Sequence, residues 1–128
     1  MRLLKGSERV TITSKAPGKL FIAGEYAVVE PGHGAIVAAV SRYLTVTIDE
    51  ATSVGTLTST QNPDVVVEWI RKGELFHAKE DHPYKLVEEA IFVAEQYVRE
   101  SGKKTFALYS LSITSELDDA KRGIKYGL

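Results

Sequence analysis

The chain has 128 residues, of which 44 % are hydrophobic and 26 % are charged, a composition typical of one globular domain. It contains no cysteine, which excludes disulfides, thiolate metal sites and a thiol nucleophile. The net charge of −1 argues against duplex nucleic acid as a partner. No apolar run is long enough for a membrane span or a secretory signal, so we expect a cytoplasmic protein with no membrane partner.

The balanced total hides a local excess of positive charge. Residues 1–42 carry six basic and three acidic side chains, a net charge of +3, and the last eight residues carry three basic and no acidic ones. If the two segments meet in space, they would form a local site for an anion on a nearly neutral protein.

The first predicted elements are two short strands, residues 10–15 and 19–23. The segment between them contains Pro17 and Gly18, which favour a turn. Four glycines follow between residues 18 and 34. Glycine loses more conformational entropy than other residues when it is ordered, so this cluster indicates a backbone that turns sharply or approaches another segment closely.

The remaining sequence predicts further strands and one helix. The strands are residues 35–40, 43–49, 55–60, 65–70, 74–77 and 106–114. These elements predict an α+β fold, in which a helix packs on one face of a mainly antiparallel sheet. Residues 116–128 are expected to be a polar, basic and glycine-containing tail.

The predicted helix begins near Pro83 and ends at Gly102. Apolar residues recur at intervals of three and four and form the expected core stripe: Val87, Ala90, Ile91, Ala94, Tyr97 and Val98. Glu95 and Arg99 lie four residues apart on the opposite face, where we expect a solvated ion pair.

Lys19 is the first candidate for chemistry. It follows the Pro-Gly pair and precedes an apolar strand, so rigid backbone could hold its ammonium at a strand edge as a clamp for an anion or phosphate. A solvated surface lysine is the more common explanation for such a residue. Glu25 and Tyr26 could orient a hydroxylated substrate, but polar residues at strand ends are commonplace.

Other candidates are weaker. His33, His77 and His82 do not have the spacing of metal ligands, and the Asp118-Asp119 pair would attract magnesium only with phosphates nearby. The glycine patterns of dinucleotide-binding and P-loop proteins are absent.

Two segments resemble motifs of the GHMP small-molecule kinases. Residues 15–32, Lys-Ala-Pro-Gly-Lys-Leu-Phe-Ile-Ala-Gly-Glu-Tyr-Ala-Val-Val-Glu-Pro-Gly, resemble the N-terminal motif of that family. Residues 125–128, Lys-Tyr-Gly-Leu, resemble the opening of its second, nucleotide-binding motif. Mevalonate kinases and galactokinases usually have Glu-His where this chain has Glu25 and Tyr26, which favours the phosphomevalonate kinase branch.

The resemblance implies transfer of the γ-phosphoryl group of ATP to (R)-5-phosphomevalonate, with magnesium accompanying the ATP. Both reactants carry phosphates, so cations must offset crowded negative charge. The family residue that matches Lys19 lies at the reaction centre, and the one that matches Lys125 is expected to hold the substrate phosphate. The implied site residues are Lys19 as catalytic, Lys19, Glu25, Tyr26 and Lys125 as substrate-binding, and Tyr126, Gly127 and Leu128 as ATP-binding.

The resemblance also implies that residues 1–128 are one GHMP N-terminal domain that stops within its nucleotide loop. We therefore expect a truncated domain that is inactive alone. The alternatives are another GHMP kinase, acting on mevalonate or a sugar, or a noncatalytic α+β module that binds RNA or protein. An RNA-binding sheet should interleave basic and aromatic residues, but strands 43–49 and 106–114 contain no lysine or arginine.

Overall fold

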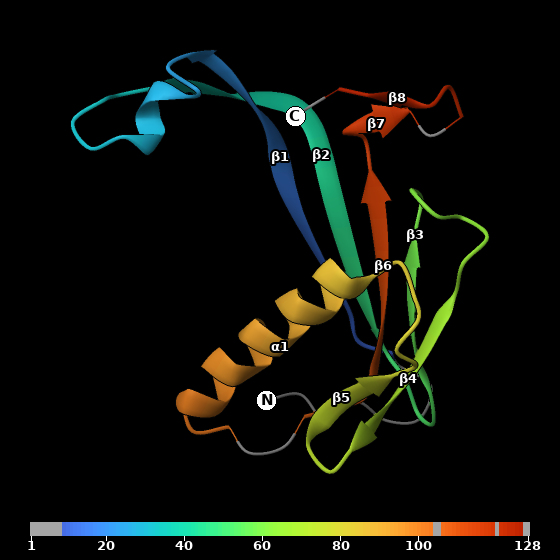
Figure 1. Cartoon of the computed structure of the whole chain (residues 1–128). Helices are drawn as coiled ribbons and strands as arrows, with labels where there is room; N and C mark the ends of the chain where they lie inside the picture. Colours follow the sequence, from blue (N-terminus) through green and yellow to red (C-terminus); the bar gives the residue numbers. More distant parts are fainter. Residues whose placement is uncertain (1–8, 104–105, 120, 127–128) are drawn as a thin grey trace.

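The computed structural model describes residues 9–103, 106–119 and 121–126. It is built from a six-stranded sheet, one long helix and a small two-stranded sheet (Figure 1). The elements in chain order are β1 (Thr11–Ala23), η1 (Ala27–Val29), β2 (Ile36–Glu50), β3 (Gly55–Ser59), β4 (Val67–Lys72), β5 (Leu75–Ala78), α1 (Lys85–Glu100), β6 (Tyr109–Ser115), β7 (Asp118–Asp119) and β8 (Ile124–Lys125).

The strands of the large sheet lie in the order β1-β2-β6-β3-β4-β5. Only the β3–β6 pair is parallel, and the other four pairs are antiparallel. Helix α1 lies against one face of this sheet (Figure 1). The expected plan, a helix on a mainly antiparallel sheet, is confirmed.

The predicted turn at residues 16–18 is wrong, because β1 continues through it as one strand. The ladder with β2 shifts there instead: Pro17 pairs with Tyr43, and the next residue, Gly18, pairs with Val40. Proline cannot donate a backbone hydrogen bond, but β1 is an edge strand, where one such loss is tolerated. A strand on an edge therefore accommodates the Pro-Gly pair that suggested a turn.

The two strands predicted at residues 35–40 and 43–49 are likewise one strand, β2. The predictions for β3, β4 and β5 are right to within about two residues, as expected for boundaries that fray. Strand β6 begins three residues after the predicted start at 106. The expected polar tail contains the short β7–β8 hairpin.

The core lies between α1 and the centre of the sheet. Leu57 and Trp69 are almost completely buried, and Leu111 from the neighbouring strand and Ile91 from the helix pack in the same cluster. Fully burying one large apolar side chain contributes about 1.5–3 kcal/mol to folding. These contacts fix the helix on β3, β4 and β6.

Helix α1 begins at Lys85, soon after Pro83, and is followed by Gly102 in the left-handed region (φ +99°). The predicted core stripe is only partly right, because Ile91 is buried while Tyr97 is 73 % exposed. The predicted solvated face is wrong at Glu95, which is buried against the sheet. The helix is thus rotated relative to the expectation from its apolar pattern.

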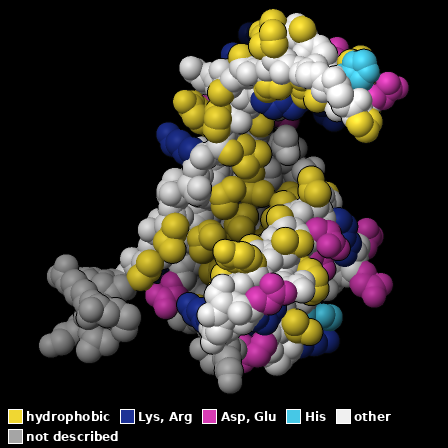
Figure 2. Space-filling view, turned by 90° about the vertical axis from the view of Figure 1, so that its left-hand side faces the viewer, with side chains coloured by type: hydrophobic (Ala, Val, Ile, Leu, Met, Phe, Trp, Pro, Cys, Tyr) yellow, Lys and Arg dark blue, Asp and Glu magenta, His cyan; other side chains and the backbone are white. Residues whose placement is uncertain are grey.

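The β1–β2 pair extends beyond the helix as an arm that ends in the η1 loop (Figure 1). In the space-filling view, this arm overhangs a hollow with a largely apolar wall (Figure 2). The exposed apolar residues include Leu20, Ile22 and Ile36 on the arm and Leu86, Val93 and Tyr97 on the helix. The described part of the chain does not cover this face. Among the same residues, no helix is long and apolar enough to cross a membrane.

Candidate functional site

Two lysines of β1 stand at the exposed edge of the sheet. Lys15 and Lys19 flank the register shift at Pro17 and Gly18, and both side chains are exposed. The Lys15 ammonium lies 5.7 Å from the ring centroid of Tyr43, and the Lys19 ammonium lies 5.3 Å from that of Phe21. Aromatic faces thus hold two cations at the solvent-accessible edge, an arrangement suited to an anion.

The loop after β1 depends on a glycine. Gly24 has φ +79°, and a Cβ atom there would collide with the carbonyl oxygen of Gly34. The Gly24 carbonyl also accepts a hydrogen bond from the backbone N–H of Val28 at 3.0 Å. The expectation that a glycine permits a close backbone approach is confirmed at this position.

Glu25 and Tyr26 lie in the turn between β1 and η1. The strand ends at Ala23, where the sequence predicted its end, so both residues follow it. Tyr26 is 83 % exposed and is the residue from which the short helix begins. Their assignment to a substrate pocket stays a prediction.

Lys125 lies in the β7–β8 hairpin, opposite Asp118. It lines a pocket of about 330 Å³ together with Gln61, whose side-chain amide donates a hydrogen bond to the Asp118 carboxylate at 2.8 Å. Tyr126 follows and is 40 % exposed. The other two predicted ATP-binding residues, Gly127 and Leu128, lie outside the described residues.

Strand β2 connects the two basic segments. It pairs with β1 along one edge, and at Tyr43 it also binds the chain that leads into the hairpin. The Tyr43 N–H donates to the Glu116 carboxylate, and the Glu116 N–H donates to the Tyr43 carbonyl, both at 2.9 Å. Arg42, which precedes Tyr43 in β2, places its guanidinium 4.5 Å from the ring centroid of Tyr126. The segments that carry Lys19 and Lys125 are thus both attached to the same part of β2.

The histidines and the acidic pair make local contacts. The side chain of His82 is buried near the start of α1, where it accepts a hydrogen bond from the Tyr84 N–H at 3.1 Å and contacts the Glu88 carboxylate at 2.9 Å. Asp119 pairs with Arg122 at 3.5 Å. Within the described ranges, no group of three acidic or histidine side chains is placed to hold a metal ion.

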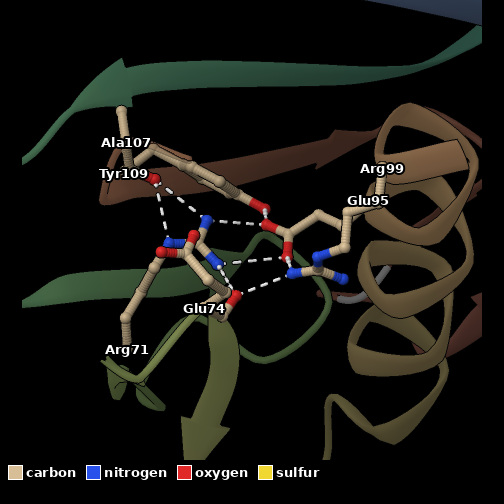
Figure 3. Close-up of polar contacts among 6 residues, drawn as sticks. All are labelled: Arg71, Glu74, Glu95, Arg99, Ala107 and Tyr109. Atoms are coloured by element: carbon tan, nitrogen blue, oxygen red, sulfur yellow. Dashed lines mark hydrogen bonds and ion pairs between the residues drawn. The ribbon is translucent and has the colours of Figure 1, made fainter. Parts of the chain in front are cut away.

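A buried ionic network joins α1 to the sheet (Figure 3). Arg71 on β4 donates two hydrogen bonds to the Glu95 carboxylate, at 2.7 and 3.1 Å. The same carboxylate accepts hydrogen bonds from the Tyr109 hydroxyl at 3.0 Å and from Arg99 at 3.3 Å. Arg71 also donates to the Ala107 carbonyl at 2.9 Å. Because Glu95 lies on α1 while Arg71 lies on β4 and Tyr109 on β6, the network fixes the position of the helix on the sheet.

The network alters two proton affinities. Burial alone would lower the pKa of Arg71, but its hydrogen bonds and ion pair with Glu95 outweigh burial and raise it. Burial, followed by the nearby Glu95 carboxylate, raises the pKa of Tyr109 well above its usual value. Arg71 therefore stays charged and Tyr109 stays neutral, so the hydroxyl keeps the proton that it donates to Glu95.

Comparison with known proteins gives a consistent relationship, although no family model matches the chain. In sequence it is 37 % identical over 129 residues to phosphomevalonate kinase from Streptomyces sp. (strain CL190), covering 92 % of this chain and 34 % of that protein. The crystal structure of the Lin0012 protein from Listeria innocua matches with a TM-score of 0.74 and 38 % identity, over 93 % of this chain and 32 % of the other.

A second solved structure carries a functional name. Phosphomevalonate kinase from Streptococcus pneumoniae, in complex with phosphomevalonate and AMPPNP, matches with a TM-score of 0.68 and 25 % identity. The match covers 91 % of this chain and 31 % of that one. Sequence and fold therefore relate this chain to phosphomevalonate kinases, as the motif resemblance indicated. The chain spans about a third of the length of these relatives.

Sequence reasoning missed Arg42 and Glu116 at the candidate site. Arg42 lies in the gap between the strands predicted at 35–40 and 43–49, and this gap could have drawn attention to it. In the structure the same residues form the irregular part of β2. No sequence signal marked Glu116, because its role depends on contacts with a residue 73 positions away.

Proposed function

We propose that the chain is the N-terminal domain of a kinase that transfers the γ-phosphoryl group of ATP to (R)-5-phosphomevalonate. The product would be 5-diphosphomevalonate, in the mevalonate pathway of isoprenoid biosynthesis, and the cytoplasm would be its location. The similarity to phosphomevalonate kinases over more than nine-tenths of the chain carries this proposal. Because the chain spans only a third of those proteins, we assign activity to the full-length protein and none to these residues alone.

In this proposal the cations at the sheet edge offset the charge of two phosphorylated reactants. Lys19 is the catalytic residue, and its ammonium would stabilise the phosphoryl group during transfer. Lys125, together with Glu25 and Tyr26, would bind phosphomevalonate. Its exposed position beside a polar pocket fits a residue that meets a phosphate. Tyr126, Gly127 and Leu128 would belong to the ATP site.

Magnesium is expected to accompany the ATP. The magnesium ion is a hard, doubly charged cation that prefers carboxylate and phosphate oxygens as ligands. Within the described residues no group of three acidic or histidine side chains is placed to hold a metal ion, and we assign no magnesium ligand to them. The roles proposed for Lys19 and Lys125 depend on their own charges and not on a metal ligand from this chain.

A coupled assay of ADP release tests the proposal on the full-length protein. ATP is supplied with phosphomevalonate, mevalonate or galactose as the acceptor, and with no acceptor as the control. We expect ADP release to depend on phosphomevalonate. A response to mevalonate or to the sugar, with none to phosphomevalonate, would assign the protein to another branch of the GHMP kinases.

A further inference from the structure

Strand β2 contains two residues, Ser41 and Arg42, that have no partner in the register with β1. The pairing passes from Tyr43 directly to Val40 as β1 passes from Pro17 to the next residue. Extra residues of this kind leave the ladder, bend the strand and re-aim a side chain. The irregularity thus lies opposite the proline of β1. Arg42 is three residues from Ala39, which is the register partner of Lys19.

Arg42 uses this position to hold the chain that follows β6. Its guanidinium stacks on the ring of Tyr126, and its Nη1 donates a hydrogen bond to the Glu116 carbonyl at 3.3 Å. The Tyr126 N–H donates to the Leu117 carbonyl at 3.3 Å, which closes the hairpin between the two contacts. A single side chain therefore touches both ends of the segment that carries Lys125.

We infer that Arg42 is a positioning residue that sets where the Lys125–Tyr126 pair lies relative to Lys19. The effect of Arg42 on catalysis rests on the proposed function, whereas its effect on the position of the hairpin rests on its own contacts. Arginine suits this task because a planar guanidinium can stack on a ring and donate in its own plane at the same time. Lysine at this position would keep the charge without that geometry.

Steady-state kinetics of the full-length protein test the catalytic consequence. Arg42→Ala should raise the KM for ATP or phosphomevalonate about tenfold, a change that corresponds to the loss of one partly desolvated cation–π contact. Arg42→Lys should recover only part of this loss. Arg9→Ala, at an exposed arginine far along the chain from the hairpin, is the matched control and should leave KM unchanged.

A double-mutant cycle separates positioning from direct binding. If Arg42 acts through Tyr126, Arg42→Ala should change KM by less than about twofold in a Tyr126→Ala background. An equal loss in both backgrounds, with full recovery by Arg42→Lys, would show that Arg42 binds a phosphate directly and would overturn the inference.

Hydrogen–deuterium exchange gives a readout that does not depend on activity. Arg42→Ala should speed exchange of the Glu116 and Tyr126 amides while the amides of α1 keep their wild-type rates. Unchanged exchange at those two amides would overturn the inference even if the kinase assay succeeds. Absence of turnover in the unmodified protein would contradict the proposed function, and the exchange rates would still decide the role of Arg42.

Discussion

Arg71 and Glu95 form a two-bond ion pair between β4 and α1, and their side chains are only 11 % and 8 % exposed. Pairing offsets much of the desolvation cost of two buried charges, whereas removal of one partner leaves the other charge buried without compensation. The pair is therefore a strong constraint on the position of the helix, and its removal provides a direct test.

Glu95→Gln should destabilise the fold by about 3–5 kcal/mol, because the amide leaves the Arg71 charge buried without a counter-ion. Urea denaturation of the wild type and of Glu95→Gln measures the difference in their free energies of unfolding. Glu89→Gln, at an exposed position of the same helix, is the matched control and should change the free energy of unfolding by less than about 0.5 kcal/mol. Equal stabilities of the two variants would contradict a buried ion pair.

The raised pKa of Tyr109 predicts a pH dependence. Above about pH 10 the unfolded chain loses the tyrosine proton while the folded protein keeps it, so the free energy of unfolding falls as pH rises. The slope contributed by one such group reaches about 1.4 kcal/mol per pH unit. Tyr109→Phe should be less stable at neutral pH, because it loses the hydrogen bond to Glu95, but it should show a flatter alkaline decline.

Urea denaturation at several pH values between about 9 and 11.5 follows this decline. Tyr97→Phe is the control, since its ring is exposed on α1 and the variant should decline as the wild type does. Buried Tyr84 also has a raised pKa and should account for part of the remaining slope. If the free energy of unfolding falls equally steeply with pH in the wild type and in Tyr109→Phe, position 109 does not hold a buried neutral hydroxyl.

Gly24 and Gly32 offer a matched comparison of strain and close contact. Both have positive φ, but only at Gly24 would a Cβ atom collide with backbone, whereas at Gly32 it would meet open space. Alanine at either position costs about 1 kcal/mol or more for the left-handed conformation. Gly24→Ala should cost clearly more and displace the Glu25–Tyr26 turn, as measured by thermal unfolding and by amide exchange of Val28. Similar losses for both variants would disprove the close approach.

Lys19→Ala in the full-length protein should lower kcat by about 10²- to 10³-fold, the scale of losing one charge donor at a transferring group. The coupled ADP-release assay measures it. Lys72→Ala removes another exposed lysine, at the end of β4, and should retain wild-type turnover. If both variants keep full activity, Lys19 is only a solvated surface residue.

The sequence allowed prediction of the elements but not of their orientation. Spacings of three and four residues located α1, yet the same spacing put Glu95 in solvent, because an apolar pattern cannot reveal a carboxylate that finds two arginines and a tyrosine in the core. The Pro17-Gly18 pair suggested a turn, since its tolerance depends on β1 being an edge strand. The edge, like the parallel β3–β6 pairing, is set by contacts between distant residues.

The candidate site was predicted through its motifs and not through its contacts. Lys19 and Lys125 follow from residue strings that resemble a kinase family. The Lys125 segment is attached to β2 through contacts of Arg42 and Tyr43 with Glu116, more than 70 residues away, whereas Lys19 is attached through its register partner Ala39. Both attachments require the folded chain.

Phosphorus NMR of the complete reaction tests the central claim most directly. The full-length protein is incubated with ATP, magnesium and phosphomevalonate, and the mixture is analysed for the chemical form of the transferred phosphate. We predict that the phosphate monoester signal of phosphomevalonate is replaced by the coupled pair of signals of a diphosphate, in amounts equal to the ADP formed. ADP accompanied by inorganic phosphate, with the phosphomevalonate signal unchanged, would contradict the account.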